Sequence, residues 1–491
     1  MKTCLYLSQE FAPQFCEGGL GLTSAGLTAA LERNHGWHHV IILPFYPFLL
    51  DRSARLERLG RLPSITVGDH TSNPVIFELR TEQHPSRVLL VRSDEWYDRG
   101  GIYRGSEYER FPDAGDRAVF YGLCIREMVR LGFVTGNIVH GNDWQSGAAL
   151  SFLRNTLSAT REKRPRLLFN IHSAKHKGYI GKAGVRLLEN HASCSDLLGH
   201  DVDRGVSLLQ VGILAADRIV TGSPTYARDV MKELRRDGLR RLSDVWVEGI
   251  IAGIDTSVWD PGCAEETDLR YSRGDAMGGK AKSKRRLYER FGLSGSGVEP
   301  VFCVCGRLVQ EKGVDLLLEG LMDIFKTGGA RLVVMGNGVR SFVDQLRQIE
   351  REAAGHIKYF QEYSLGTARH LYAASDFSLM PSRVEPCGLN QMIAMRYGTL
   401  PIVSDTGGLR DTVVDYFEDP ENGTGFILPQ LTSFCLRATV LRLLDWFECQ
   451  QDQVRRAISN AMSRDWSWTR SARKFDAIYE ELSIHAGSGG L

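Results

Sequence analysis

The chain has 491 residues, of which 43% are hydrophobic and 24% are charged, and this length favours two domains of about 200 residues each over a single domain. Lys and Arg number 60 and Asp and Glu number 59, so the net charge is +1. This balance excludes a global field that would attract nucleic acid or an acidic membrane, and any anion site must therefore be local.

The ten cysteines are scattered along the chain, and no pair of them has the spacing of zinc ligands. This pattern predicts free thiols in a reducing cytoplasm and no bound metal. The N-terminus, MKTCLYLSQEF, leads directly into an apolar strand. No window of about 18 apolar residues occurs, so we expect neither a signal peptide nor a membrane-spanning segment.

The first half of the chain alternates short apolar runs with helical patterns. The apolar runs predict strands at residues 4–8, 40–44, 88–91, 138–140, 167–171 and 219–221. The helical patterns between them include residues 23–33, 114–131, 146–156 and 224–234. This alternation favours a parallel sheet with helices on both faces.

A shift in composition between residues 260 and 290 indicates the boundary between two domains, because Gly, Ser and Lys dominate there. We interpret the basic cluster at 280–286 as a solvated helix face and not as a nucleic-acid patch. The second half then repeats the alternation, with strands expected at residues 301–305, 331–335, 357–360, 377–380, 400–403 and 425–428. The predicted fold is therefore α/β, with two Rossmann-like domains and a ligand cleft between them.

Several glycine-rich turns follow these strands and could bring backbone N–H groups close to a ligand. Gly18 and Gly19 lie in the sequence EGGLG after the first strand, and Gly336 opens a turn after strand 331–335. Each also has a simpler interpretation. EGGLG could be a plain turn, and the turn at Gly336 could be the entrance to a helix. The glycines alone do not decide between the two.

Arg307 and Lys312 follow the apolar strand 301–305 and precede an apolar helix. At the carboxyl end of a strand, a guanidinium fork and an ammonium group five residues apart can converge on one diphosphate. The alternative is two surface cations, and the apolar segments on either side favour a site.

Residues 381–412 combine an acid, a helix start and a glycine turn in about thirty positions. Glu385 stands on an apolar background, Gly388 opens a helical run over 389–397, and Thr406-Gly407-Gly408 follows the apolar strand TLPIV. This arrangement predicts a binding site for a polar, phosphorylated ligand. Glu385 could instead act only on the dipole of the helix that follows.

Two residues in the first half are further candidates. His172 ends strand 167–171, and Asp143 in HGNDWQSG lies just past strand 138–140. A lone His is often a satisfied structural residue, and an Asp at this place could be the N-cap of the next helix.

With these residues in view, the chain resembles bacterial glycogen synthases and plant starch synthases, which are retaining transferases that use ADP-glucose. The second half carries the specific motifs, namely GRLVQEKGVDLL, MPSRVEPCGLNQMIAMRYGTLPIVSDTGGLRDTV and DWSWTRSARKFDAIYEEL. The first half carries weaker ones, namely EGGLG, HGNDWQSG, NIHSAKHKG, AADRIVTGSPTYARDV and IIAGIDTSVWDP. The likeness covers nearly the whole length.

The resemblance implies the glycosyltransferase-B fold, with two facing Rossmann-like domains at residues 1–262 and 263–468. A final helix at 469–491 is expected to cross back to the first domain. The resemblance further implies transfer of glucose from a nucleotide sugar, with no metal and no cofactor beyond the donor.

It also assigns roles to residues. Arg307 and Lys312 match the pair that neutralises the donor diphosphate, and Glu385 matches the carboxylate that holds the donor sugar. His172 matches a histidine at the sugar, and Asp143 matches an aspartate on the acceptor side. The remaining residues expected at the donor supply backbone groups, and they are Gly18, Gly19, Gly336, Cys387, Gly388, Leu389, Thr406, Gly407 and Gly408.

The first half departs from the family pattern at several positions. A family lysine before the GG turn is Cys16 here, followed by Glu17, and a family histidine after the tryptophan of HGNDWQSG is Gln145. Other departures are Asn142, Ser173, Gln210 and Ala252. The second half keeps the pattern almost intact.

This asymmetry leaves three hypotheses open. The chain elongates an α-1,4-glucan from ADP-glucose, or it moves glucose or a heptose from an ADP-sugar to a small specialised acceptor, or it is a glucan-binding relative without activity. The first is favoured slightly over the second. The third is the weakest, because Arg307, Lys312, Glu385 and His172 all survive.

Overall fold

The computed structural model describes residues 2–51, 53–81, 84–105, 109–156, 165–189, 205–236, 244–263 and 270–487. The chain forms two compact units. Unit 1 is Met1–Gly253 together with Trp468–Leu491, and unit 2 is Ile254–Ser467. Unit 2 begins nine residues before the boundary expected at 262/263, because the backbone N–H of Ile254 donates to the carbonyl oxygen of Trp466 at 2.7 Å.

Unit 1 is built on a sheet in which nine strands have the order β13-β12-β9-β8-β1-β2-β7-β6-β3 in the described residues. Their bounds are β1 (Thr3–Leu7), β2 (His38–Pro44), β3 (Arg55–Arg61), β6 (Val75–Arg80), β7 (Arg87–Arg92), β8 (Ile138–Asn142), β9 (Arg166–Ile171), β12 (Arg218–Thr221) and β13 (Glu248–Gly249). Short two-stranded pairs are formed by β4 (Ile65–Val67) with β5 (His70–Ser72) and by β10 (Tyr179–Ile180) with β11 (Val206–Ser207).

The expectation of a parallel sheet holds for most of unit 1 and is wrong at one edge. There β6 pairs antiparallel with both β7 and β3. Antiparallel edge strands tolerate polar side chains because one face can meet solvent. The sequence of β3, RLERLGR, is mostly exposed or half-buried, so it lacks the apolar run that reveals the buried strands.

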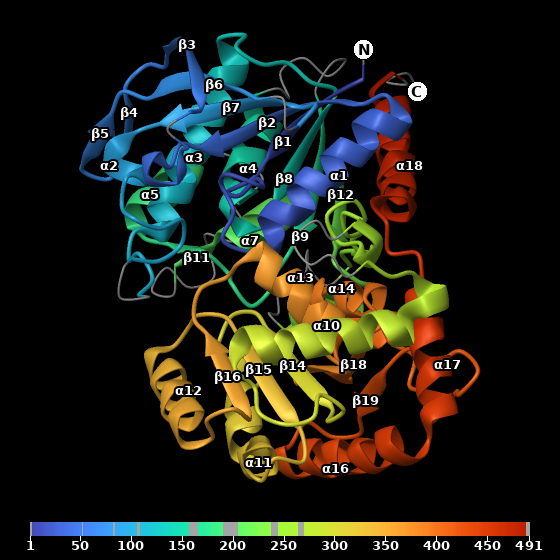
Figure 1. Cartoon of the computed structure of the whole chain (residues 1–491). Coiled ribbons are helices and arrows are strands. Elements are labelled where there is room, and N and C mark those ends of the chain that lie inside the picture. Colours follow the sequence, from blue (N-terminus) through green and yellow to red (C-terminus); the bar gives the residue numbers. More distant parts are fainter. Residues whose placement is uncertain are drawn as a thin grey trace. The chain divides into compact units, whose positions relative to one another are not determined.

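The helices of unit 1 are α1 (Gly19–His35), α2 (Asp94–Tyr97), α3 (Ala114–Arg130), α4 (Gly147–Thr156), α5 (Lys182–Glu189), α7 (Leu208–Ala215), α8 (Pro224–Arg236) and α18 (Trp468–Gly487). The last of these, α18, packs side by side with α1 (Figure 1). Its Tyr479 hydroxyl lies 2.7 Å from Nδ1 of the buried His140, and the Trp37 indole donates to Asp476 at 2.9 Å. The C-terminal helix is thus part of the core of unit 1.

Unit 2 contains a wholly parallel sheet in the order β16-β15-β14-β17-β18-β19. The strands are β14 (Val301–Cys305), β15 (Arg331–Met335), β16 (Ile357–Phe360), β17 (Phe377–Met380), β18 (Leu400–Ser404) and β19 (Phe426–Leu428). Its helices are α10 (Ala276–Phe291), α11 (Val314–Lys326), α12 (Arg340–Glu352), α13 (Leu365–Ala374), α14 (Asn390–Arg396), α15 (Gly407–Thr412), α16 (Ser433–Cys449) and α17 (Gln451–Met462). Helix α11 packs with α12 and α16, whereas α10 packs with α13 and α17 (Figure 1).

The basic cluster at 280–286 is not a wholly solvated face, which corrects the sequence-based interpretation. Lys280 is 3% exposed, and its ammonium group donates to Thr399 Oγ1 at 2.9 Å and to the Tyr397 carbonyl oxygen at 3.2 Å. Burial lowers the pKa of Lys280 to about 7. Lys284 is also buried and pairs with Asp376 at 2.6 Å. These lysines hold α10 against the sheet.

Both sheets contain a point at which the strand order reverses. In unit 2 it lies between β14 and β17, which pair in parallel, and in unit 1 it lies between β1 and β8. The loops that follow the two strands leave such a point in opposite directions, and ligands of open α/β sheets bind there. In the described part of the chain, no helix is both long and apolar enough to cross a membrane.

Candidate active site

The carboxyl edge of the unit 2 sheet brings together most of the residues expected at a donor. Arg307 and Lys312 follow β14, Glu385 and Cys387 follow β17, and the glycines at 407 and 408 begin α15 after β18. These loops flank the reversal between β14 and β17. The sequence could place each residue after its strand, but the strand order is what makes the loops neighbours.

An ion pair joins two of these loops. The Lys312 ammonium group lies 2.5 Å from a carboxylate oxygen of Glu385, and the Ser382 hydroxyl donates to the same oxygen at 3.1 Å. Glu385 is 6% exposed, whereas the side chain of Lys312 is 30% exposed. Because Lys312 is the more accessible partner, an anionic ligand could reach its ammonium group. Glu385 therefore does more than act on a helix dipole.

Arg307 lies on the same edge with its side chain exposed. Within the described part of the chain no ion pair is found for it. A bound anion would gain charge-assisted hydrogen bonds from this guanidinium fork without displacing a protein carboxylate. Arg307 and Lys312 thus supply one available cation and one that is shared with Glu385.

The loop that carries Lys312 is held by contacts with the loop after β17. Arg383 forms a fork with Asp315, with both N–O distances at 2.7 Å, and its backbone N–H donates to the Glu311 carbonyl oxygen at 2.8 Å. Gly313 has φ of +71°, and a Cβ there would lie 2.0 Å from the Pro381 carbonyl oxygen. Only glycine fits this close approach, so the position of Lys312 is fixed by the backbone.

The loops around Cys387 and Gly408 are also in direct contact. The N–H of Gly408 donates to the Glu385 carbonyl oxygen at 2.9 Å. A Cβ at Gly407 would lie 2.0 Å from that oxygen, and one at Gly408 would lie 2.0 Å from the Cys387 carbonyl oxygen. The two glycines let the loops pack tightly at the start of α15, beside Thr406.

Three other expected residues lie in this same edge. Gly388 has φ of +76°, and the Gln391 side-chain amide donates to its carbonyl oxygen at 3.0 Å. Leu389 directly precedes α14. Gly336 has φ of +155°, and a Cβ there would lie 1.8 Å from the Gly306 carbonyl oxygen. Gly336 therefore serves at least to let the loops after β14 and β15 interlock.

In unit 1 the candidates Asp143 and His172 meet at the ends of β8 and β9. Asp143 is 8% exposed and has φ of +56°, an unusual value for a residue with a side chain. Its carboxyl group accepts the backbone N–H of Ser173 at 3.3 Å. Burial raises the pKa of Asp143 to about 7. It is also the N-cap of the turn Trp144–Ser146, although its side chain makes no capping bond there.

His172 contacts Asn142, with its Nε2 lying 2.9 Å from the amide oxygen Oδ1. Burial lowers the pKa of His172 to about 4. At neutral pH His172 is therefore uncharged, while Asp143 is near its raised pKa. Asn142, which the sequence identified only as a departure from a pattern, is the residue that orients the histidine ring.

The GG turn of unit 1 is held by hydrogen bonds to a carboxylate that the sequence analysis missed. Glu10 accepts the backbone N–H groups of Glu17 at 2.7 Å and Gly18 at 2.8 Å, and the Tyr103 hydroxyl donates to it at 2.7 Å. Glu10 comes two residues after the first predicted strand. Its place at the carboxyl end of a strand was the feature of the sequence that could have identified it as a site residue. Gly19 follows as the first residue of α1.

Two of the departures from the family pattern, Cys16 and Gln145, change the charge and hydrogen bonding of unit 1. The thiol of Cys16 donates to the Gly18 carbonyl oxygen at 3.2 Å. Burial and the neighbouring Glu10 raise the pKa of Cys16 to about 12, so no charge stands where the family has a lysine. The amide oxygen Oε1 of the buried Gln145 lacks a hydrogen-bond partner in the structure. Among the described residues, no cluster of three or more His, Cys, Asp or Glu is placed to hold a metal ion.

The comparisons with known proteins agree with this geometry. Residues 3–244 match the starch synthase catalytic domain, and residues 289–461 match glycosyl transferases group 1. The glycogen synthase of Cellvibrio japonicus is 33% identical over 98% of this chain and 100% of its own length. That of Syntrophotalea carbinolica is 30% identical over 98% of this chain and 99% of its own length.

Among solved structures, the chain is similar to the catalytic domain of starch synthase IV from Arabidopsis thaliana bound to ADP and acarbose. The TM-score is 0.88 at 26% identity, and the match covers 98% of this chain and 99% of that one. This match, together with the two Rossmann-like units, confirms the predicted fold class, an α/β glycosyltransferase of the B type. The chain belongs to the glycogen synthase and starch synthase family, and it is a glycosyltransferase of that type.

Proposed function

We propose that the protein transfers glucose from ADP-glucose to an α-1,4-glucan with retention at the anomeric carbon. The observation that carries the donor half is the Lys312–Glu385 ion pair at the strand reversal of unit 2. Arg307 lies on the same edge, and no ion pair is found for it among the described residues. Support for the nucleotide comes from the starch synthase IV relative, which was solved bound to ADP and acarbose.

The proposed donor geometry assigns the diphosphate to Arg307 and Lys312. When the bond between the sugar and the phosphate breaks, negative charge develops on the departing ADP, and fixed cations that face this charge stabilise the transition state. Lys312 would then exchange part of its contact with Glu385 for the diphosphate. The released carboxylate oxygen of Glu385 would accept sugar hydroxyl groups, beside the backbone of Cys387, Gly388 and Leu389.

The proposed residues of unit 1 are Asp143, on the acceptor side, and His172, at the sugar. Both are held by backbone and amide contacts. At neutral pH the His172 imidazole is uncharged, and the Asp143 carboxyl group is near its raised pKa of about 7. Neutral hydroxyl groups of a sugar suit such an environment, because the carboxyl group and the imidazole can each exchange one hydrogen bond with them.

A second candidate function keeps the ADP-sugar donor and replaces the glucan by a small specialised acceptor. The observation that favours it is the GG turn, where Glu10 and Glu17 lie beside a neutral Cys16. A cation at this turn would attract a diphosphate, whereas carboxylates accept hydrogen bonds from hydroxyl-bearing ligands. A glucan-binding protein without activity has less support, because it needs no diphosphate cations.

The deciding experiment is a matrix of donors and acceptors read by nucleotide release. ADP-glucose, UDP-glucose and ADP-heptose are each combined with glycogen, maltotriose and a set of monosaccharide acceptors. The first proposal expects ADP release with ADP-glucose and glycogen or maltotriose. ADP release only with small acceptors would favour the second function.

Release from no donor with any acceptor would contradict both enzymatic proposals. The matched control is the double variant Arg307→Ala, Lys312→Ala. It should release no nucleotide above background under the conditions in which the wild-type protein is active.

A further inference from the structure

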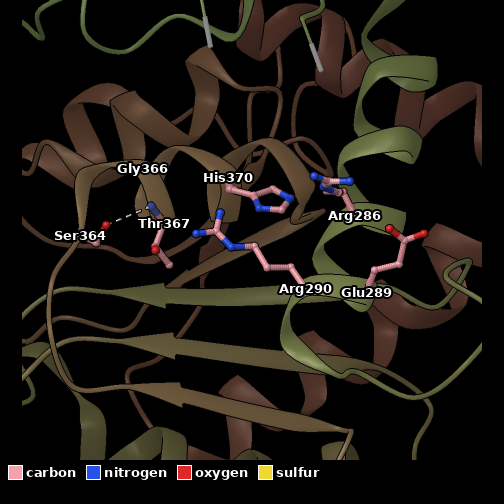
Figure 2. A pocket seen from close by; sticks show the side chains of 7 residues that line it. All are labelled: Arg286, Glu289, Arg290, Ser364, Gly366, Thr367 and His370. Carbon is pink, nitrogen blue, oxygen red and sulfur yellow. Dashed lines mark hydrogen bonds between the residues drawn. The ribbon is translucent and has the colours of Figure 1, made fainter. Parts of the chain in front are cut away.

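A hollow of about 680 Å³ lies in unit 2 between α10 and the start of α13 (Figure 2). It is lined by Arg286, Glu289 and Arg290 of α10 and by Ser364, Gly366, Thr367 and His370 around the start of α13. This volume suits a small molecule. None of the lining residues belongs to the proposed donor or acceptor set, so the proposed function does not account for it.

The hollow carries a net positive charge, because two arginines and one glutamate line it. Arg286 and Arg290 are both exposed and lie one helical turn apart. In the described residues neither forms an ion pair, and Glu289, which also lines the hollow, forms none with them. Two like charges four residues apart on a helix repel each other. A bound anion would remove this repulsion.

The start of α13 adds backbone donors to the same hollow. The Ser364 hydroxyl caps the helix by accepting the N–H of Thr367 at 3.4 Å. The N–H groups of Leu365 and Gly366 precede the first intrahelical bond, which runs from Ala368 to Ser364. Such N–H groups, together with the positive end of the helix dipole, are well suited to bind anions.

A buried side chain gives an independent indication of a ligand. His370 is 1% exposed, and its Nε2 lies 3.0 Å from the Ser283 carbonyl oxygen. Its Nδ1 is buried and has no hydrogen-bond partner among the residues that the structure describes. Figure 2 shows the imidazole ring between the guanidinium groups of Arg286 and Arg290. A buried polar atom without a partner costs free energy, and a ligand in the hollow could supply that partner.

We propose that this hollow is a binding site for a phosphate group, either inorganic phosphate or a phosphomonoester. Arg286 and Arg290 bind the phosphate oxygens, and the N–H groups at the start of α13 bind a further oxygen. The monoanion of a phosphomonoester, whose second pKa is near 6, carries a hydroxyl, and inorganic phosphate keeps at least one at neutral pH. This hydroxyl can donate to Nδ1 of His370. A carboxylate anion has no such hydroxyl at neutral pH.

Isothermal titration calorimetry tests the proposal with inorganic phosphate and glycerol phosphate as ligands. The titrations use the full-length chain carrying Arg307→Ala and Lys312→Ala, so that phosphate cannot bind at the proposed diphosphate site. Both ligands are expected to give saturable binding below about 20 mM. Tighter binding of glycerol phosphate would identify a phosphomonoester as the ligand, and equal or tighter binding of phosphate would identify inorganic phosphate.

Variants in the same background locate the binding. The double variant Arg286→Gln, Arg290→Gln should weaken binding about 30-fold or more, because two charge-assisted contacts are lost. The matched control is Arg285→Gln, which removes the same charge from an exposed position of α10 that does not line the hollow. It should change the affinity by less than about twofold.

Two results would overturn the proposal: no saturable binding in this range, or equal losses in the control and the double variant. Circular dichroism melting of each variant excludes unfolding as the cause. The titrations contain no sugar nucleotide, so they can fail while nucleotide release succeeds. Conversely, phosphate can bind in the hollow even if the wild-type protein releases no nucleotide. The titrated Arg307→Ala, Lys312→Ala protein lacks the proposed diphosphate cations, so its phosphate binding does not depend on the donor site.

Discussion

The carboxyl edges of the two sheets have the same topology and opposite chemistry. In unit 2 the loops at the strand reversal present Arg307 and Lys312, and glycines lock the backbone around them. In unit 1 the corresponding loops present Glu10 and the buried Asp143.

Under the proposed function, one Rossmann-like scaffold serves two kinds of ligand through its loops alone. The unit 2 edge suits an anion because its cations are partly accessible. The unit 1 edge suits a neutral ligand rich in hydroxyl groups, since its main polar groups are carboxyls and an uncharged imidazole.

The largest expected effect tests the cationic edge of unit 2. Lys312→Ala should lower the rate of nucleotide release about 100-fold to 1,000-fold, because a cation that faces developing charge is lost. The loss of stability should be much smaller and should come from the unpaired Glu385.

Adding Glu385→Gln to Lys312→Ala separates the two effects. The double variant should regain most of the thermal stability, since no buried carboxylate is left unpaired, and it should stay inactive. If Lys312→Ala kept activity close to that of the wild-type protein, the assignment of Lys312 to the donor site would be wrong.

A second prediction concerns the glycine contacts of the unit 2 edge. Gly408→Ala should destabilise the protein by about 3 kcal/mol, because the new Cβ would lie 2.0 Å from the Cys387 carbonyl oxygen. Urea unfolding measures the loss. The control is Gly278→Ala, an exposed position in α10 where a Cβ meets nothing within 4 Å. That variant should gain about 0.5 to 1 kcal/mol, because alanine favours a helix over glycine.

A third prediction tests the titrating carboxyl of unit 1. The pKa of Asp143 is raised in the folded state to about 7, so the folded protein binds its proton more tightly than the unfolded chain does. The resulting stabilisation is complete below pH 4 and is lost as the pH rises towards 7.

The reference for this measurement is Asp143→Asn, which has the same shape and does not titrate. Relative to this variant, the wild-type protein should lose about 2 to 3 kcal/mol of unfolding free energy between pH 5 and pH 8. Parallel pH profiles for the two proteins would show that Asp143 does not titrate in this range.

The smallest expected effect tests the missing cation of unit 1. Cys16→Lys should raise the activity with ADP-glucose about two- to fivefold if the turn once contacted a phosphate, with Glu10 and Glu17 limiting the gain. Cys16→Met is the control for side-chain length without charge. An unchanged rate in Cys16→Lys would show that this turn has been redesigned for another ligand.

The strands of unit 2 were predicted closely from the sequence. Four of them, β14 to β17, begin and end at the expected residues, because parallel strands buried on both faces appear as continuous apolar runs between turns. The antiparallel strands β3 and β6 were missed. These strands pair with each other at one edge of the sheet, and β6 also pairs with β7. Some of their side chains are polar and exposed, so the strands do not appear as continuous apolar runs.

The sequence by itself determined the family, the two-unit α/β fold and the residue types at the unit 2 edge, since these follow from local patterns and motifs. Only the tertiary structure paired Lys312 with Glu385, 73 positions away, and Glu10 with Tyr103, 93 positions away. It also buried Lys280 and, within the described residues, left Nδ1 of His370 without a hydrogen-bond partner. Contacts of this kind depend on strand order and helix packing, which bring together residues that no local pattern relates.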